Sequence, residues 1–206
     1  TFWSIGASWR IAEEKFMEST HDWLSELKLR VTYGTQGNEA LTNYYPYTDQ
    51  WNVTVSEGKL GTEITYYGNP DLTWEKQNTF DIGLDAAFFD NRLSFSFDYF
   101  ERVSDGLLFR RTKDISTGRA YDWYNVGKLE NTGIEFEAKG TIIQKKDWYW
   151  EVSLNGYSYK NKMLNLPEEY KETGMPNGNQ RIYEGKDIYT WEMREFAGVN
   201  DKGASM

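Results

Sequence analysis

The chain has 206 residues, a formal net charge of -9, no cysteine, and no apolar run long enough for a membrane-spanning helix. The absence of cysteine excludes disulfides, thiolate nucleophiles and cysteine-based metal sites, and the acidic balance argues against a nucleic-acid partner. The mean hydropathy of -0.75 is compatible with a transmembrane barrel, because barrel strands carry a polar residue at every second position.

Apolar and polar residues alternate strictly in five segments of about ten residues, the length that a tilted strand needs to cross a bilayer. Their alternating cores are residues 3–11, 27–33, 80–86, 93–99 and 134–139. A period of two places the apolar side chains of a strand on one face of a sheet. Strands of soluble proteins average only about 5–6 residues. The pattern therefore predicts an all-β fold, an antiparallel transmembrane β-barrel, of which this chain forms a part.

The predicted strands are joined alternately by short and long connections. We expect strands over residues 2–12, 27–35, 74–89, 92–102, 126–143 and 148–160, with a seventh over 188–199. The short connections are residues 13–25, 90–91 and 144–147, and the first of them is expected to include a turn of helix. The long connections are the first long loop (37–73), the second (103–125) and the third (161–187). Bacterial outer-membrane barrels have short periplasmic turns and longer extracellular loops, which predicts the side on which each connection lies.

Aromatic residues lie at both ends of the predicted strands. Phe88, Phe89, Trp148 and Trp150 flank short turns, whereas Tyr33 and Tyr99 lie about nine residues further along their strands. Two aromatic girdles separated by one strand length are typical of an outer-membrane barrel. The core of a soluble β-sandwich, which shows the same alternation, remains an alternative for these residues.

The two faces of the predicted sheet differ in charge. The apolar face is expected to contact lipid through Trp3, Ile5, Trp9, Leu27, Leu29, Val31, Phe80, Ile82, Leu84, Leu93, Phe95, Phe97, Ile134 and Phe136. The opposite face is expected to line the lumen with Lys28, Arg30, Asp81, Asp85, Arg92, Asp98, Glu135, Glu137, Lys139 and Glu151. An Arg or Lys facing lipid at the bilayer midplane costs about 2–4 kcal/mol, so the charges belong inside. The interior of an eight-stranded barrel is just filled by side chains, so a lumen with this many charges indicates a wider barrel. Six or seven strands form only part of such a barrel.

The residues give no support to an enzyme or a metal site. Glu135 with Glu137, and Asp81 with Asp85, are evenly spaced on one strand face, as lumen lining produces, and no base or nucleophile lies nearby in the sequence. His21 is the only histidine, so a histidine-based metal site is excluded. Loop carboxylates could bind calcium, but no EF-hand spacing supports such a site, and no cofactor is predicted.

Ten short motifs occur in a defined order along the chain. They are WLSELKLRVTYG (23–34), QGN (36–38), GNPDLTWEK (68–76), FDIGLD (80–85), NRL (91–93), FDYF (97–100), NVG (125–127), ENTGIE (130–135), EGK (184–186) and AGV (197–199). Each motif is weak alone, but together and in this order they resemble the SusC/RagA family of TonB-dependent outer-membrane transporters of the Bacteroidetes.

The resemblance implies a 22-stranded barrel that is closed by an N-terminal plug domain and imports oligosaccharides or peptides with energy from the TonB complex. It also implies a SusD-like surface lipoprotein over the extracellular mouth and a place in the outer membrane of a Gram-negative, Bacteroidetes-like cell. Residues 1–206 are then expected to be a C-terminal fragment of the barrel domain, without the plug, the signal peptide and the remaining strands.

Aromatic residues crowd the first two long loops. Their flat rings can stack on sugar rings or peptide side chains, or pack against a neighbouring loop or a lipoprotein lid. The contact candidates are Tyr44, Tyr45, Tyr47, Trp51, Tyr121, Trp123 and Tyr124.

Two other functions compete with import. A soluble carbohydrate-binding β-sandwich would use the aromatic loops as its binding surface. A barrel enzyme such as an outer-membrane lipase or protease would need a histidine-containing constellation, for which His21 in a short connection is badly placed. The family resemblance favours the importer over both.

Overall fold

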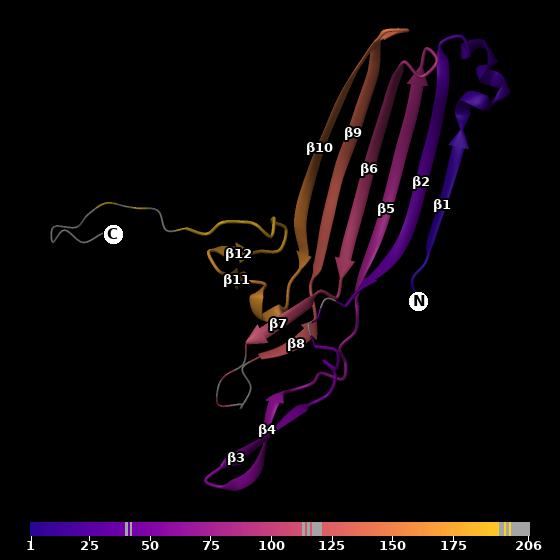
Figure 1. Cartoon of the computed structure of the whole chain (residues 1–206). Helices are drawn as coiled ribbons and strands as arrows, with labels where there is room; N and C mark the ends of the chain where they lie inside the picture. Colours follow the sequence, from indigo (N-terminus) through magenta and orange to yellow (C-terminus); the bar gives the residue numbers. More distant parts are fainter. Residues whose placement is uncertain are drawn as a thin grey trace.

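Six strands form a single antiparallel sheet, and their order across the sheet follows their order along the chain (Figure 1). The sheet comprises β1 (Ser4–Arg10), β2 (Leu24–Asn38), β5 (Glu75–Phe88), β6 (Leu93–Asp105), β9 (Lys128–Lys145) and β10 (Trp148–Asn165). This computed structural model describes residues 1–39, 41, 43–112, 114, 116, 121–193, 196 and 198. The predicted all-β, antiparallel fold is confirmed.

Three strands, β2, β6 and β10, are longer than the sequence pattern indicated, whereas β5 is slightly shorter and β9 has the expected length. β2, β5, β6, β9 and β10 have 15, 14, 13, 18 and 18 residues. The β2–β5 ladder, for example, continues to the pair Asn38↔Glu75, where alternation no longer marks a strand. Backbone groups pair whether or not the side chains alternate, so the ladder extends beyond the apolar segment at the loop end.

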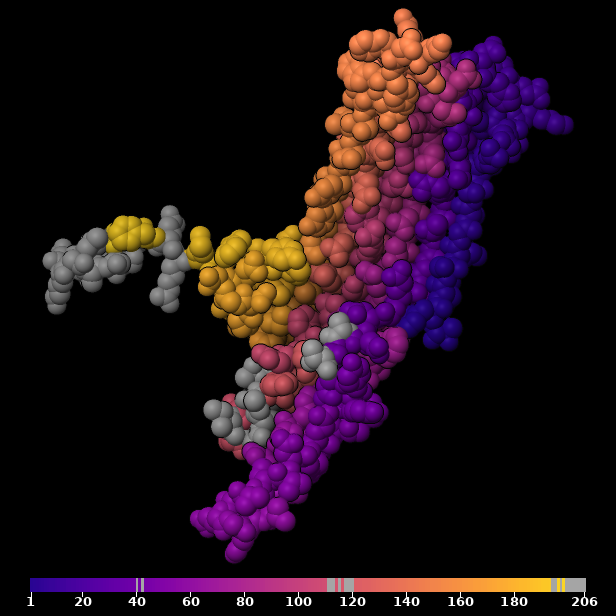
Figure 2. Space-filling model, in the orientation of Figure 1, coloured from indigo at the N-terminus to yellow at the C-terminus, as the bar shows by residue number. Residues whose placement is uncertain are grey.

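Short and long connections lie at opposite ends of the sheet (Figure 1). The short end has the 3-10 turns η1 (Ile11–Glu13) and η2 (Lys15–Thr20), as expected for residues 13–25. At the loop end, the first long loop contains an antiparallel hairpin over residues 50–66. The loop end carries β3 (Gln50–Ser56), β4 (Lys59–Tyr66), β7 (Leu108–Thr112), β8 (Tyr121–Asn125), η4 (Glu168–Tyr170), β11 (Met175–Asn177) and β12 (Gln180–Ile182). In the space-filling view the first long loop, coloured violet, projects well beyond the end of the sheet (Figure 2).

The predicted seventh strand over 188–199 is wrong for the part of that range that the structure describes, 188–193, 196 and 198. Trp191 makes only an isolated bridge with Gln180. Asp187 turns the chain instead, because its Oδ1 accepts a hydrogen bond from the Tyr189 amide at 2.7 Å and its carbonyl accepts one from the Thr190 hydroxyl at 2.6 Å. An Asp that bonds the backbone two residues on favours a turn over an extended strand.

The register places the apolar residues in rows across one face of the sheet. Leu29, Leu84, Phe97 and Phe136 lie in one such row. Leu84, Phe97 and Phe136 keep exposed fractions of 41%, 46% and 43%. An apolar surface of this extent and exposure is typical of a surface that contacts a partner or a membrane.

Aromatic side chains gather at the short end of the sheet. Trp23 stacks on Phe88 with ring centroids 5.9 Å apart, and Phe88 also contacts Phe95 at 6.1 Å. Trp148 and Trp150 are exposed by 73% and 55%. Amphipathic rings concentrated at one level along the strands fit a membrane–water interface.

The buried core lies at the loop end. It consists of Met163, Leu166 and Ile182, against which Tyr170 and Ile188 pack. Met163 pairs with Leu129, two positions along from the pair Asn161↔Asn131. Met163 and Leu129 therefore lie on the polar face of the sheet, opposite the apolar rows. The third long loop therefore folds over that face at the end of β10.

The third long loop also pairs with the backbone of β10. The Met163 amide donates a hydrogen bond to the Lys186 carbonyl at 2.9 Å, and the Gly185 amide donates one to the Met163 carbonyl at 2.7 Å. The loop thus occupies the outer edge of β10 at this residue.

No helix in the described residues is long and apolar enough to span a membrane.

A charge on the apolar face tests its environment. We expect Phe97→Arg to lower the free energy of unfolding of the full-length protein in lipid vesicles by about 2–4 kcal/mol, because the guanidinium would lie near the bilayer midplane. Ser153→Arg, on the opposite face of β10, is the control and should cost less than about 1 kcal/mol. Urea unfolding followed by tryptophan fluorescence measures both, and equal costs would contradict a lipid-facing apolar surface.

Candidate functional site

Most of the side chains predicted to line the lumen lie together on one face of the sheet, which we call the charged face. The register aligns Lys28 of β2 with Asp85 of β5, and Asp98 of β6 with Glu135 of β9. The predicted lumen residues on this face are Lys28, Arg30, Asp81, Asp85, Asp98, Glu135, Glu137, Lys139 and Glu151.

Arg92 differs from the rest of the predicted lumen set. It precedes β6 in a turn, where its Nη2 donates hydrogen bonds to the carbonyls of Thr141 and Ile142 at 3.4 and 3.3 Å. The alternation predicted that Arg92 lies on the polar face of a strand, but the turn includes Arg92 and β6 begins only at Leu93. The Arg92 guanidinium holds the end of β9 beside the turn.

Arg30 joins three strands through hydrogen bonds on the charged face. Its Nε and Nη2 donate to both carboxylate oxygens of Asp85 at 2.7 and 2.9 Å, and its Nη2 also donates to Asp98 at 3.0 Å. Ser96 donates to Asp85 at 2.9 Å and is 3.2 Å from Asp98. Side-chain exposures of 35%, 28% and 29% for Arg30, Asp85 and Asp98 leave this network half-buried. A bidentate pair with a second carboxylate is among the stronger polar contacts available to a strand.

Gly83 makes this network possible, and sequence reasoning missed it. Gly83 lies in register between Arg30 and Asp98. A Cβ added to Gly83 would lie 2.7 Å from Arg30 Nη2 and closer still to Asp98 Oδ1. The guanidinium therefore crosses β5 directly over the glycine backbone. A glycine within an alternating strand is the signal that could have found it, since it often marks a close approach.

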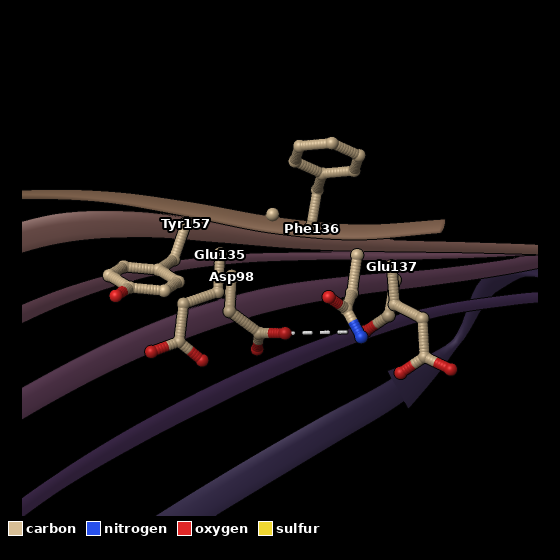
Figure 3. Close-up of a pocket in the computed structure, with 8 residues that line it drawn as sticks. Asp98, Glu135, Phe136, Glu137 and Tyr157 are labelled. Carbon is tan, nitrogen blue, oxygen red and sulfur yellow. Dashed lines mark hydrogen bonds between the residues drawn. The ribbon is translucent and has the colours of Figure 1, made fainter. Parts of the chain in front are cut away.

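Carboxylates gather beside the Arg30 network. Asp98, Glu135 and Glu137 line a cavity of 310 Å³ on the charged face with Asn155 and Tyr157. Their side chains and the Tyr157 ring extend to one side of the sheet, whereas Phe136 points to the other (Figure 3). Lys139 is 3.2 Å from Glu151 further along the same face. This wall can attract cationic groups, while among the described residues no cluster suits a metal ion.

The aromatic candidates of the first long loop are mainly exposed. Tyr44 is 90% exposed and Trp51 57%. Tyr45 and Tyr47 contact each other edge to face with centroids 6.4 Å apart. These rings are open to a ligand or to another protein.

The aromatic candidates of the second long loop are partly used in packing. Tyr124 donates from its hydroxyl to Asp122 at 3.0 Å, and Asp122 is only 6% exposed. Tyr121 contacts Trp123 edge to face at 6.5 Å. Burial, together with Tyr121 and Asp122 nearby, raises the pKa of the Tyr66 hydroxyl, which donates to the Pro46 carbonyl at 3.2 Å.

The first two long loops are joined by asparagine side chains that sequence reasoning did not identify. Asn125 accepts from the Thr73 amide at 2.6 Å and donates to the carbonyls of Thr73 and Gly106 at 2.6 and 2.9 Å. Asn69 donates to the Trp123 carbonyl at 2.8 Å. These bonds satisfy backbone groups that no strand pairs, so the two loops form one unit.

Comparison with known families identifies the sheet. Residues 1–190 match the family described as TonB dependent receptor-like, beta-barrel. The chain belongs to this family of TonB-dependent receptors.

Two curated TonB-dependent receptors illustrate the relationship. TonB-dependent receptor P3 of Formosa agariphila is 34% identical over 98% of this chain and 21% of its own length. TonB-dependent receptor SusC of Bacteroides thetaiotaomicron is 32% identical over 75% of this chain and 16% of its own length. The chain thus spans about a fifth of the length of the curated receptors it matches. The resemblance to the SusC/RagA family is confirmed, and these relatives are receptors rather than enzymes.

Solved structures agree with the sequence relatives. The RagAB peptide transporter superposes with a TM-score of 0.83 at 35% identity, over 98% of this chain and 22% of that chain. The RagAB peptide importer in its 'open-open' state gives a TM-score of 0.84 at 32% identity. The sheet is therefore part of a TonB-dependent receptor barrel.

A methyl group at Gly83 tests the Arg30 network. We expect Gly83→Ala to lower the free energy of unfolding of the full-length receptor by about 1–3 kcal/mol, because the guanidinium or Asp98 must move. Gly140→Ala is the matched control, since a Cβ there meets Leu93 Cδ1 at an ordinary 3.7 Å. Denaturant titration measures both variants, and equal effects would show that the crossing over Gly83 is not tight.

The Asn125 bonds predict a local effect. We expect Asn125→Ala to speed amide hydrogen exchange at least about tenfold in the first and second long loops, because it removes hydrogen bonds worth about 1 kcal/mol each. Exchange in β5 and β6 should stay unchanged. Asn52→Ala, on exposed β3, serves as the control. Unchanged loop protection in Asn125→Ala would contradict the role of this residue in joining the loops.

Proposed function

We propose that this chain forms part of the barrel wall and mouth of an outer-membrane importer of oligosaccharides or peptides. The importer takes its energy from the TonB complex through a plug domain outside this chain and works with a SusD-like surface lipoprotein. Import would begin with capture of the ligand by the extracellular loops. Rearrangement of the plug under force from TonB would follow, and then passage along the charged lumen.

The observation that supports this proposal most directly is the division of one sheet into two unlike faces. The apolar face has half-exposed rows such as Leu84, Phe97 and Phe136, and the opposite face has the Arg30 network and the carboxylates around Asp98. A wall with lipid on one side and water on the other requires this division.

The proposed lumen and lipid contacts follow from these faces. We propose that the charged face lines the aqueous path and that the apolar face contacts outer-membrane lipid. The exposed aromatic rings of the first long loop, Tyr44, Tyr45, Tyr47 and Trp51, are the candidates for contact with the ligand or the lipoprotein. Tyr121 and Trp123 are candidates for the same role, whereas Tyr124 supports the loop from within through Asp122.

The competing functions have less support. A carbohydrate-binding sandwich requires a second sheet packed face to face with the first, and in the described residues the remaining sheets are two-stranded hairpins at the loop end. A barrel lipase or protease requires a catalytic histidine, and His21 is held in the short connection by a contact with the Ala12 carbonyl at 2.8 Å.

Uptake by cells tests the proposal. Cells with the full-length gene should accumulate a labelled mixture of oligopeptides and oligosaccharides, and cells with that gene deleted should not. Removal of TonB, with the receptor still present at the surface, should abolish accumulation while surface binding persists. Accumulation that survives loss of TonB would overturn active import, and equal accumulation by the deletion strain would overturn import altogether.

A further inference from the structure

A second cavity lies at the loop end, between the β7–β8 hairpin and the segment that follows β10. Its volume is 390 Å³, within the range of about 300–1,000 Å³ typical of ligand sites. Its walls are mainly carbon, formed by Phe109, Tyr124, Val126, Pro167, Tyr170 and Met175.

The buried core supports this cavity from behind. Phe109, Tyr170 and Met175 line the cavity and also pack against Met163, Leu166 and Ile182. Because Met163 pairs with Leu129 on the charged face, the cavity lies where the proposed lumen reaches the extracellular mouth. Walls fixed by a core stay in place when a ligand arrives, which lowers the entropy cost of binding.

Two exposed charged residues, Arg110 and Glu168, also line the cavity. The Arg110 guanidinium lies over the Tyr121 ring, 4.9 Å from its centroid, on the hairpin side. On the other side Glu168 lies 2.6 Å from Lys171. The site thus combines a carbon-lined interior with donors and acceptors at its rim.

This combination distinguishes between ligand classes. A sugar ring carries hydroxyl groups around its whole edge, and a carbon-lined pocket that encloses the ring leaves them without hydrogen bonds at a cost in free energy. A peptide separates its polar backbone from its side chains, so an apolar side chain can enter while the backbone stays at the charged rim. The aromatic walls favour an aromatic ring in particular.

We propose that this cavity is a side-chain pocket for an apolar, preferably aromatic, residue of an imported peptide. The inference rests on the proposed import function and assigns its ligand class to peptides.

Paired peptides test the pocket in the full-length receptor with its lipoprotein. The probes are two pentapeptides that differ only in a central Phe or Ala, and calorimetry gives each Kd. We expect the Phe peptide to bind about tenfold more tightly or better, from burial of the ring. Val126→Phe, which fills the cavity, should remove this preference. Met175→Ala, which removes part of one wall, should reduce the preference by several-fold and provides a second reading if Val126→Phe does not fold.

Phe16→Ala is the control variant. Phe16 lies in η2 of the short connection and is 65% exposed, and its loss should leave the preference intact. Equal binding of both peptides by the unaltered receptor, or a preference that survives both cavity variants, would overturn the pocket. Binding of a neutral oligosaccharide in place of both peptides would overturn the peptide assignment while import stands. Failure of the deletion strain to lose uptake would instead overturn the import proposal itself.

Discussion

The structure depends on continuous antiparallel pairing of the backbone across β5, β6 and β9. In hydrocarbon every backbone amide and carbonyl must find its partner within the protein, and strands satisfy this requirement only sideways. From β5 through β6 to β9 the register runs without a shift, so each row of paired residues, such as Leu84, Phe97 and Phe136, stays on one face across all three strands. A shift by one residue in any strand would turn its apolar side chains, such as Phe97, to the charged face and its charged side chains, such as Asp98, to the apolar face. Both the apolar surface and the charged surface therefore follow from one property of the backbone.

The charged face adds cross-strand contacts to this ladder. Arg30 compensates Asp85 and Asp98 at once, which leaves the carboxylates of Glu135 and Glu137 to set the potential of the wall beside it. Part of the charge is thus used for structure and part remains available to whatever moves along the face. At the loop end the same face changes from charged to apolar, where Leu129 and Met163 meet the third long loop.

Features that depend on the apolar/polar alternation and on turn residues could be predicted from the sequence. Features that depend on the register between strands could not. Alternation identified the two faces and the short and long connections, because a period of two is local information. The crossing of Arg30 over Gly83 depends on which residues three strands place side by side, and Asn125 reaches Thr73, 52 residues away in the sequence. The expected strand after Asp187 failed for a local reason, since that side chain turns the chain. The aromatic loop residues were recognisable as a group, but only the contacts separate the internally bonded Tyr124 from the open Tyr44.

The pairing of Gly185 and Lys186 with Met163 has a geometric consequence for the rim of the barrel. Both outward-facing backbone groups of Met163 are occupied by the chain's own loop. A neighbouring strand that joins β10 must therefore stop short of residue 163, although β10 itself continues to Asn165. The rim of the wall therefore steps down at this seam.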